Sequence, residues 1–237
     1  MHTRISNNSP QIYARGAAVL YIITIVAGIM AQMVIGGQVI VSGDAAATAT
    51  NILANKELFQ VGFSLYMLEM LCQSAQMLLF YILLNPVNRN IALMGLGIGL
   101  IGSTIKTISR LFYLAPLLVL SNPEALQSFN TAQLQDLALL LLNINDQAAG
   151  IALIFFGVST FVNGYLIFRS GYLPRILGVF SMLGGLGWFT YIYPPFGNQM
   201  LMLILPIALM GSFSIIGWLL VKGVNIERWQ QRALVSA

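Results

Sequence analysis

Four ionisable side chains stand inside or beside long apolar stretches of this sequence: Glu69, Lys106, Arg110 and Asp146. A charged group within a membrane costs roughly 2.5 to 3.5 kcal/mol on insertion scales and marks a functional site by default. An arginine binds a carboxylate or a phosphate through two parallel hydrogen bonds. A carboxylate beside an amide such as Gln73 can receive a hydroxyl or an amine. We therefore treat these five residues as candidate binding residues.

The heights of the four charges in their helices predict how they pair. Counting a rise of about 1.5 Å per residue from the inner helix ends, Glu69 and Lys106 both lie about 22 Å up, Arg110 about 29 Å and Asp146 about 33 Å. We expect Glu69 to pair with Lys106 in the outer third of the bilayer. We expect Arg110 to pair with Asp146 near the outer interface, with all four side chains facing the bundle interior.

Helical spacing groups these charges with neutral polar residues. Two apolar stretches carry polar residues at i, i+4 and i+7, which places each set on one helical face. The sets are Glu69, Gln73 and Gln76 in one stretch, and Ser103, Thr107 and Arg110 in the other. We expect one connected polar patch. The same pairs could instead hold helices together, although intramembrane hydrogen bonds average only about 0.6 kcal/mol.

The sequence offers little for metal or cofactor chemistry. Its one cysteine, Cys72, lies in an apolar run, and its one histidine, His2, lies in a polar leader. Neither has the neighbours that a metal site requires, so we expect no metal and no cofactor. The glycines from Gly95 to Gly102 lack the strand that precedes a dinucleotide-binding turn, and Gly95 with Gly99 instead predicts close helix packing.

Composition excludes a water-soluble enzyme. The 237 residues are 58% hydrophobic and 8% charged, with a mean hydropathy of +0.82, whereas soluble chains carry about a quarter charged residues. The net charge is +4, but the eleven basic residues are scattered singly rather than gathered on one face. We therefore expect an integral membrane protein that does not bind nucleic acid.

Six apolar stretches are long enough to cross a hydrocarbon core of about 30 Å. We expect an all-α bundle of six transmembrane helices in three hairpins. A polar interruption at 143–147 separates the fourth stretch from an apolar extension, so this helix could protrude, tilt or break there. The predicted spans are Gly16–Gly36, Phe59–Leu84, Ile91–Leu118, Ala148–Phe168, Ile176–Tyr193 and Met200–Val221.

The loops alternate in charge, which predicts the orientation. Cytoplasmic loops retain lysine and arginine, and this rule places both termini in the cytoplasm. The inner segments contain Arg4, Arg15, Arg89, Arg169, Arg175, Lys222, Arg228 and Arg232, whereas the outer loops contain Asp44, Glu57, Glu124 and Asp136 against Lys56.

Three segments follow from this pattern: a polar cytoplasmic leader (1–14), a six-helix transmembrane domain (15–223) and a cytoplasmic interfacial tail (224–237). In the first outer loop, Asp44 precedes an alanine-rich run that continues through Leu53. Aspartate is a favoured N-cap, so we expect a short outer helix after the first span.

Three strings of the sequence resemble those of a known family. They are Gly43-Asp44-Ala45-Ala46-Ala47-Thr48-Ala49, Asn85-Pro86-Val87-Asn88-Arg89 and Arg169-Ser170-Gly171-Tyr172-Leu173-Pro174-Arg175-Ile176-Leu177-Gly178. The chain resembles, from about Arg15 to Gly223, the bacterial membrane proteins catalogued as domain of unknown function family 4386. This resemblance implies a bacterial multi-helix membrane protein and carries over neither an activity nor catalytic residues.

Three function classes fit these observations. We favour a multi-pass protein of the plasma (inner) membrane that binds or transports a small polar or anionic molecule or a lipid headgroup at the charged patch. A structural or regulatory subunit, with the charge pairs as glue, is the alternative. An intramembrane lipid-modifying enzyme ranks lower, because no histidine, metal-ligand spacing or nucleophile elbow accompanies the carboxylates. Beyond the bilayer and such a ligand, a second copy of the chain is the partner that we would expect.

Overall fold

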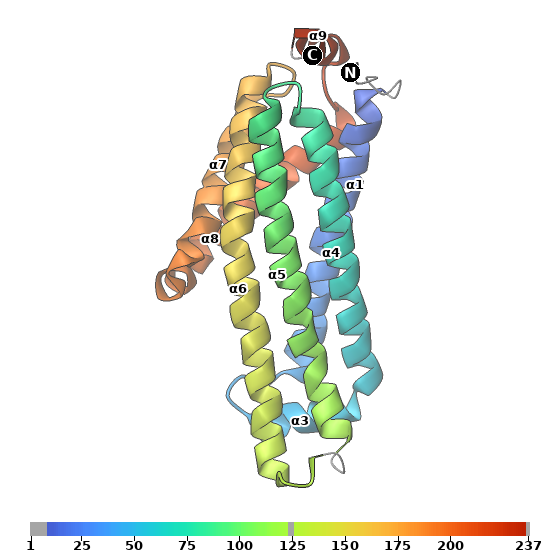
Figure 1. Cartoon of the computed structure of the whole chain (residues 1–237), viewed down its shortest axis with the longest axis vertical. Helices are drawn as coiled ribbons and strands as arrows, with labels where there is room; N and C mark the ends of the chain where they lie inside the picture. The colour runs from blue at the N-terminus through green and yellow to red at the C-terminus, as the bar shows by residue number, and fades with distance from the viewer. Residues whose placement is uncertain (1–8, 123–125, 236–237) are drawn as a thin grey trace. The chain divides into compact units, whose positions relative to one another are not determined.

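Helices account for nearly all of the computed structural model, which describes residues 9–122 and 126–235 and contains no strand within them. Six helices are long and apolar enough to cross a membrane (Figure 1), so the predicted all-α fold is confirmed. Glu124 and residues 1–8 of the predicted leader lie outside the described residues. The spans are α1 (Pro10–Ile29) continued by η1 (Met30–Ile35) and α2 (Gly36–Val39), α4 (Lys56–Leu84), α5 (Arg89–Ser121), α6 (Thr131–Ser170), α7 (Arg175–Phe189) with the 3-10 turn η3 (Thr190–Ile192), and α8 (Pro194–Val221).

The helices begin or end beyond the apolar stretches that predict them. The first begins at Pro10, inside the predicted leader, where proline suits a first helical turn because its missing N–H needs no partner there. The fourth, α6, runs unbroken for 40 residues through the polar positions 143–147. At about 1.5 Å per residue it is about 60 Å long, twice the hydrocarbon thickness. The apolar extension therefore belongs to the same helix.

Two short helices complete the described chain. The predicted outer helix is confirmed as α3 (Ala45–Ala54), whose N-cap Asp44 accepts a hydrogen bond of 2.8 Å from the backbone N–H of Ala47. The last helix, α9 (Ile226–Val235), follows α8 and is amphipathic, with Trp229 buried and Arg228 and Arg232 exposed.

The chain forms two compact units. Unit 1 comprises residues 1–22, 72–103 and 151–237, and unit 2 comprises residues 23–71 and 104–150. Unit 2 has an aromatic core in which Phe59 stacks on Tyr113 at 4.4 Å between ring centroids. The Tyr66 ring meets Tyr113 edge-on at 5.1 Å. Buried tyrosine rings therefore form part of the core of unit 2.

Unit 1 depends on close backbone contact between α6 and α7. A Cβ added to Gly178 would lie 2.5 Å from the carbonyl oxygen of Gly164, and one added to Gly157 would lie 2.7 Å from that of Gly185. Only glycine fits such approaches, which let the backbones of neighbouring helices come close together. The predicted packing at Gly95 is confirmed, because the Ser159 hydroxyl donates to its carbonyl oxygen at 2.8 Å.

Candidate functional site

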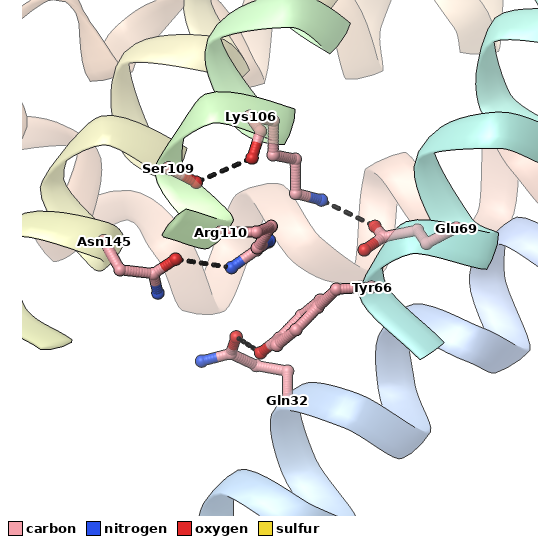
Figure 2. A network of polar contacts seen from close by, with 7 residues as sticks. All are labelled: Gln32, Tyr66, Glu69, Lys106, Ser109, Arg110 and Asn145. Atoms are coloured by element: carbon pink, nitrogen blue, oxygen red, sulfur yellow. Dashed lines mark hydrogen bonds and ion pairs between the residues drawn. The ribbon is translucent and has the colours of Figure 1, made fainter. Parts of the chain in front are cut away.

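A buried ion pair joins α4 to α5 in unit 2. The Nζ atom of Lys106 lies 2.6 Å from Oε1 of Glu69, with side-chain exposures of 16% and 8% (Figure 2). The predicted pairing of these two residues is confirmed, and it arises because they sit at the same height on neighbouring helices. Each charge neutralises the other, which offsets part of the cost of burying both.

Arg110 has a different partner from the predicted one. Its Nη1 group donates to Oδ1 of Asn145 at 2.9 Å (Figure 2), and Nδ2 of Asn145 donates in turn to Oδ1 of Asp146 at 2.9 Å. Within the described residues Arg110 forms no ion pair with Asp146, so the predicted direct pair is wrong. The height estimate was close, but the helical face was not: Asn145 is 2% exposed and turns inward, whereas Asp146, one residue on, is exposed.

A tyrosine and an irregular helical segment complete this charged network. The guanidinium of Arg110 lies 3.6 Å from the ring centroid of Tyr66, a cation–π contact that stabilises a desolvated cation. The Tyr66 hydroxyl donates to Oε1 of Gln32 at 2.5 Å. Gln32 belongs to the π-helical segment η1, and such segments are frequent at functional sites. Figure 2 shows Arg110 between the ion pair and the Tyr66–Gln32 contact.

Several buried atoms of the network lack a hydrogen-bond partner within the described chain. They are Oε2 of Glu69, Nε of Arg110 and the hydroxyl of Tyr113. Such atoms call for water, an ion or a functional role. The predicted binding role of Glu69, Lys106, Arg110 and Asp146 is untested and stays a prediction, and neither of the two cavities described below is lined by any of them.

The polar stripes predicted on α4 and α5 are only partly buried. On α5, Ser103 is buried but Thr107, on the same predicted face, is exposed. On α4, Gln73 and Gln76 belong to unit 1, where both line a cavity of about 100 Å³. Gln73 is thus the one candidate residue that the structure places at a cavity.

The cavity of unit 1 is polar but uncharged. None of the described residues that line it is acidic or basic. Counting about 1.5 Å per residue, Gln76 lies about 12 Å and Asn163 about 10 Å from the end of its helix, inside the apolar spans. The polar and aromatic lining residues are Tyr21, Gln73, Gln76, Phe80, Phe156, Ser159, Thr160, Asn163, Phe180, Ser181, Trp188 and Ser212.

Most hydroxyl groups of the cavity are already hydrogen-bonded, but the two glutamine oxygens are not. Ser212 donates to the carbonyl of Ala208 at 2.9 Å, and the Tyr21 hydroxyl lies 2.7 Å from the Ser212 oxygen. In contrast, Oε1 of Gln73 and Oε1 of Gln76 are buried and have no partner in the described chain. Two of the side chains that line the cavity therefore carry a buried acceptor without a partner in the described chain.

Sequence reasoning missed most of this cavity. A signal was available in the fourth span, where Ser159, Thr160 and Asn163 are neutral polar residues within about one helical turn. Asn145 and Tyr66 were also missed as partners of Arg110. A neutral polar side chain in an apolar helix indicates a functional site less strongly than a charged one, because its insertion cost is smaller.

The helices and their polar interior define a multi-pass α-helical membrane protein. The chain belongs to the family described as domain of unknown function (DUF4386), whose model matches residues 17–223. This match confirms the resemblance of the sequence strings. No curated protein and no solved structure matches the chain.

Proposed function

We propose that this protein binds a small, uncharged molecule that donates hydrogen bonds, inside the cavity of unit 1, as the recognition step of transport or sensing. The observation that carries the proposal is that two side chains lining a cavity within the apolar spans each carry a buried acceptor without a partner, Oε1 of Gln73 and Oε1 of Gln76. A buried polar atom without a partner costs free energy. A ligand donor that meets both atoms would recover that cost.

The cavity lining favours a neutral ligand over an ion. Moving an ion out of water is far more costly than moving a neutral polar group, unless a charge of opposite sign receives it. No described lining residue offers such a charge. The volume of about 100 Å³ leaves room for a small molecule. The rings of Trp188 and Phe156 supply apolar walls for the body of such a molecule.

The charged network of unit 2 has another role in this proposal. Lys106 is paired with Glu69, and Arg110 is bound to Asn145 and Tyr66, so these charges hold α4, α5 and α6 together. The proposal narrows the expected ligand, a small polar or anionic molecule or a lipid headgroup, to a neutral polar molecule, and it keeps Gln73 from the candidate residues. Location in the plasma membrane of a bacterium belongs to the proposal and rests on the family resemblance.

Acetamide and acetate, which are close in size and differ in charge, test the ligand class. The thermal midpoint Tm of the full chain in one neutral detergent is measured with millimolar acetamide, acetate or ethylammonium. We expect acetamide to raise Tm in a dose-dependent way and both ions to leave it unchanged. A ligand at about ten times its Kd stabilises by about 1.4 kcal/mol.

Variants on α4 locate the effect. The double variant Gln73→Leu with Gln76→Leu should lose the response to acetamide, because both acceptors are removed at similar volume. Gln60→Leu is the matched control, since Gln60 is an exposed amide on the same helix. Equal responses to acetamide and acetate, no response at all, or a response that survives in the double variant would each reject the proposal.

A structural or regulatory subunit is the second candidate, and one observation favours it. The Glu69–Lys106 pair is closed at 2.6 Å, as expected of charges that serve only to hold helices. This candidate predicts that no small molecule shifts Tm through Gln73 and Gln76. The acetamide experiment therefore separates the two functions.

A further inference from the structure

A basic groove lies beside α9 in unit 1 and shares no lining residue with the small-molecule cavity. Its volume is about 700 Å³. Two exposed arginines, Arg228 and Arg232, stand one turn apart on α9 and line it. The other walls come from the turns that join α4 to α5 and α6 to α7, through Val87, Ser170 and Gly171.

Backbone contacts orient both guanidinium groups. Nη1 of Arg228 donates to the carbonyl oxygen of Gly171 at 3.1 Å, and Nη2 of Arg232 donates to that of Arg169 at 3.5 Å. A guanidinium carries five N–H donors in a fixed fork. Arg228 forms no ion pair within the described chain, so its single carbonyl contact positions the fork and leaves most of its donors for a ligand.

The groove is held in shape by the attachment of α9 to the end of α4. The Trp229 Nε1 group and the Tyr172 hydroxyl both donate to the carbonyl oxygen of Leu83, at 3.0 Å and 2.6 Å. The backbone N–H of Asn225 donates to the carbonyl of Tyr172 at 3.2 Å. These contacts tie α9 to the end of α4 and to the turn between α6 and α7, so the arginines need not be ordered when a ligand arrives.

Charge is strongly asymmetric between the two units. The sequence of unit 1 carries eight basic residues against one acidic residue, Glu227. Arg89, Arg169 and Arg175 lie at helix ends beside the turns that form the groove, at the end of unit 1 where Figure 1 shows α9. This end therefore attracts anions over a distance of about a Debye length.

The groove also has an apolar edge that suits a membrane surface. Val235 lines it and is 87% exposed, and the neighbouring Leu234 is 72% exposed. Val235 comes seven residues after Arg228 and so shares the arginines' face of α9. Basic and apolar groups thus stand together in the groove, as suits the interface between headgroups and acyl chains. The position of α9 directly after the last span places it at that level.

We infer that this groove binds the phosphate-bearing headgroup of an anionic phospholipid. Arg228 and Arg232 donate hydrogen bonds to the phosphate oxygens, because the geometry of the guanidinium donors matches that of a phosphate. The apolar edge at Leu234 and Val235 receives the upper part of the acyl chains. Lipid bound there fixes α9 against the ends of α4 and α6.

The test compares phosphatidylglycerol with phosphatidylcholine of the same acyl chains. The purified full chain in neutral detergent is mixed with both lipids in equal amounts, and the retained lipid is counted by native mass spectrometry. We expect retention of phosphatidylglycerol over phosphatidylcholine. In Arg228→Gln with Arg232→Gln, the affinity for phosphatidylglycerol should fall about thirtyfold, at about 1 kcal/mol for each basic residue near the surface.

The matched control removes two positive charges outside the groove, in Arg175→Gln with Lys222→Gln. Because Arg175 and Lys222 do not line the groove, this control should keep the preference for phosphatidylglycerol and lose clearly less affinity than the groove variant. Equal retention of the two lipids by the parent chain, or an equal loss in the control, would overturn the inference. Competition by inorganic phosphate at the concentration of the lipid would also overturn it, because the site would then be one for a soluble anion. The parent-chain result decides the matter even if the double variant does not fold.

Discussion

Glu69 and Lys106 form an ion pair at 2.6 Å between α4 and α5, and both side chains are largely shielded from solvent. The two opposite charges lie on separate helices in the apolar part of the chain. The helices must bring them into contact, because either charge alone would be buried and unpaired. The pair therefore specifies which faces of α4 and α5 meet in unit 2.

A double-mutant cycle measures the worth of this pair. Glu69→Gln and Lys106→Met should each lower the free energy of unfolding by about 3 kcal/mol, because each leaves one buried charge without its partner. The double variant should recover most of that loss. Unfolding is followed in one fixed detergent, and neutral or stabilising single variants would show instead that the charges are kept for function at the expense of stability.

Asn145, rather than Asp146, should carry the stabilising contact to Arg110. Asn145→Ala removes the acceptor of the Arg110 hydrogen bond and should destabilise the protein by about 1 to 3 kcal/mol. Asp146→Asn should change stability by less than about 0.5 kcal/mol, because Asp146 is exposed. The Tm values of the two variants rank their losses of stability. A larger loss in Asp146→Asn than in Asn145→Ala would support a direct Arg110–Asp146 pair instead.

Gly178 should tolerate no side chain. A Cβ there would meet the carbonyl oxygen of Gly164 at 2.5 Å and the backbone nitrogen of Phe168 at 2.6 Å. Gly178→Ala should therefore destabilise the protein by about 1 to 3 kcal/mol through forced separation of α6 and α7. Gly217→Ala on α8 is the control, since nothing lies within 4 Å of its added Cβ, and it should be neutral or slightly stabilising. Equal Tm values for the two variants would contradict this packing.

Trp188 reports on entry into the cavity of unit 1. Acrylamide is an uncharged amide that quenches indole fluorescence, and iodide is a charged quencher. The part of the emission that disappears in Trp188→Phe should be quenched by acrylamide but hardly by iodide, because a neutral amide fits the cavity lining and an anion does not. Quenching by both, or by neither, would contradict a cavity selective for neutral molecules.

Ionisation of Tyr172 should lower the free energy of unfolding at alkaline pH. Burial raises the pKa of its hydroxyl above the ordinary value of 10.0, although nearby Arg232 opposes the shift. The folded protein thus keeps the proton that donates to Leu83 while the unfolded chain ionises, so this contribution is present below pH 10 and is lost as the pH rises beyond it. In Tyr172→Phe the fall in Tm above pH 10 should be less steep. Tyr193→Phe, at an exposed position, should keep the steepness of the parent, and an unchanged slope in Tyr172→Phe would contradict the assignment.

The sequence by itself determined the class of protein and much of its fold. Six apolar stretches, the cap at Asp44 and the pairing of Glu69 with Lys106 could be predicted, because they depend on hydrophobic length, local hydrogen bonding and equal height along neighbouring helices. The helix ends were predicted less well, since backbone hydrogen bonding carries α6 through polar residues that hydropathy treats as an interruption.

Only the tertiary structure decided which polar side chains face one another. Adjacent residues on a helix point about 100° apart, so one position separates the buried Asn145 from the exposed Asp146, and a sequence gives height more reliably than direction. The cavity behind Gln73 and Gln76 and the groove beside Arg228 each combine segments far apart in the chain. Such sites exist only once α1, α4, α6, α7, α8 and α9 are packed, because their chemistry depends on which groups remain without partners after packing.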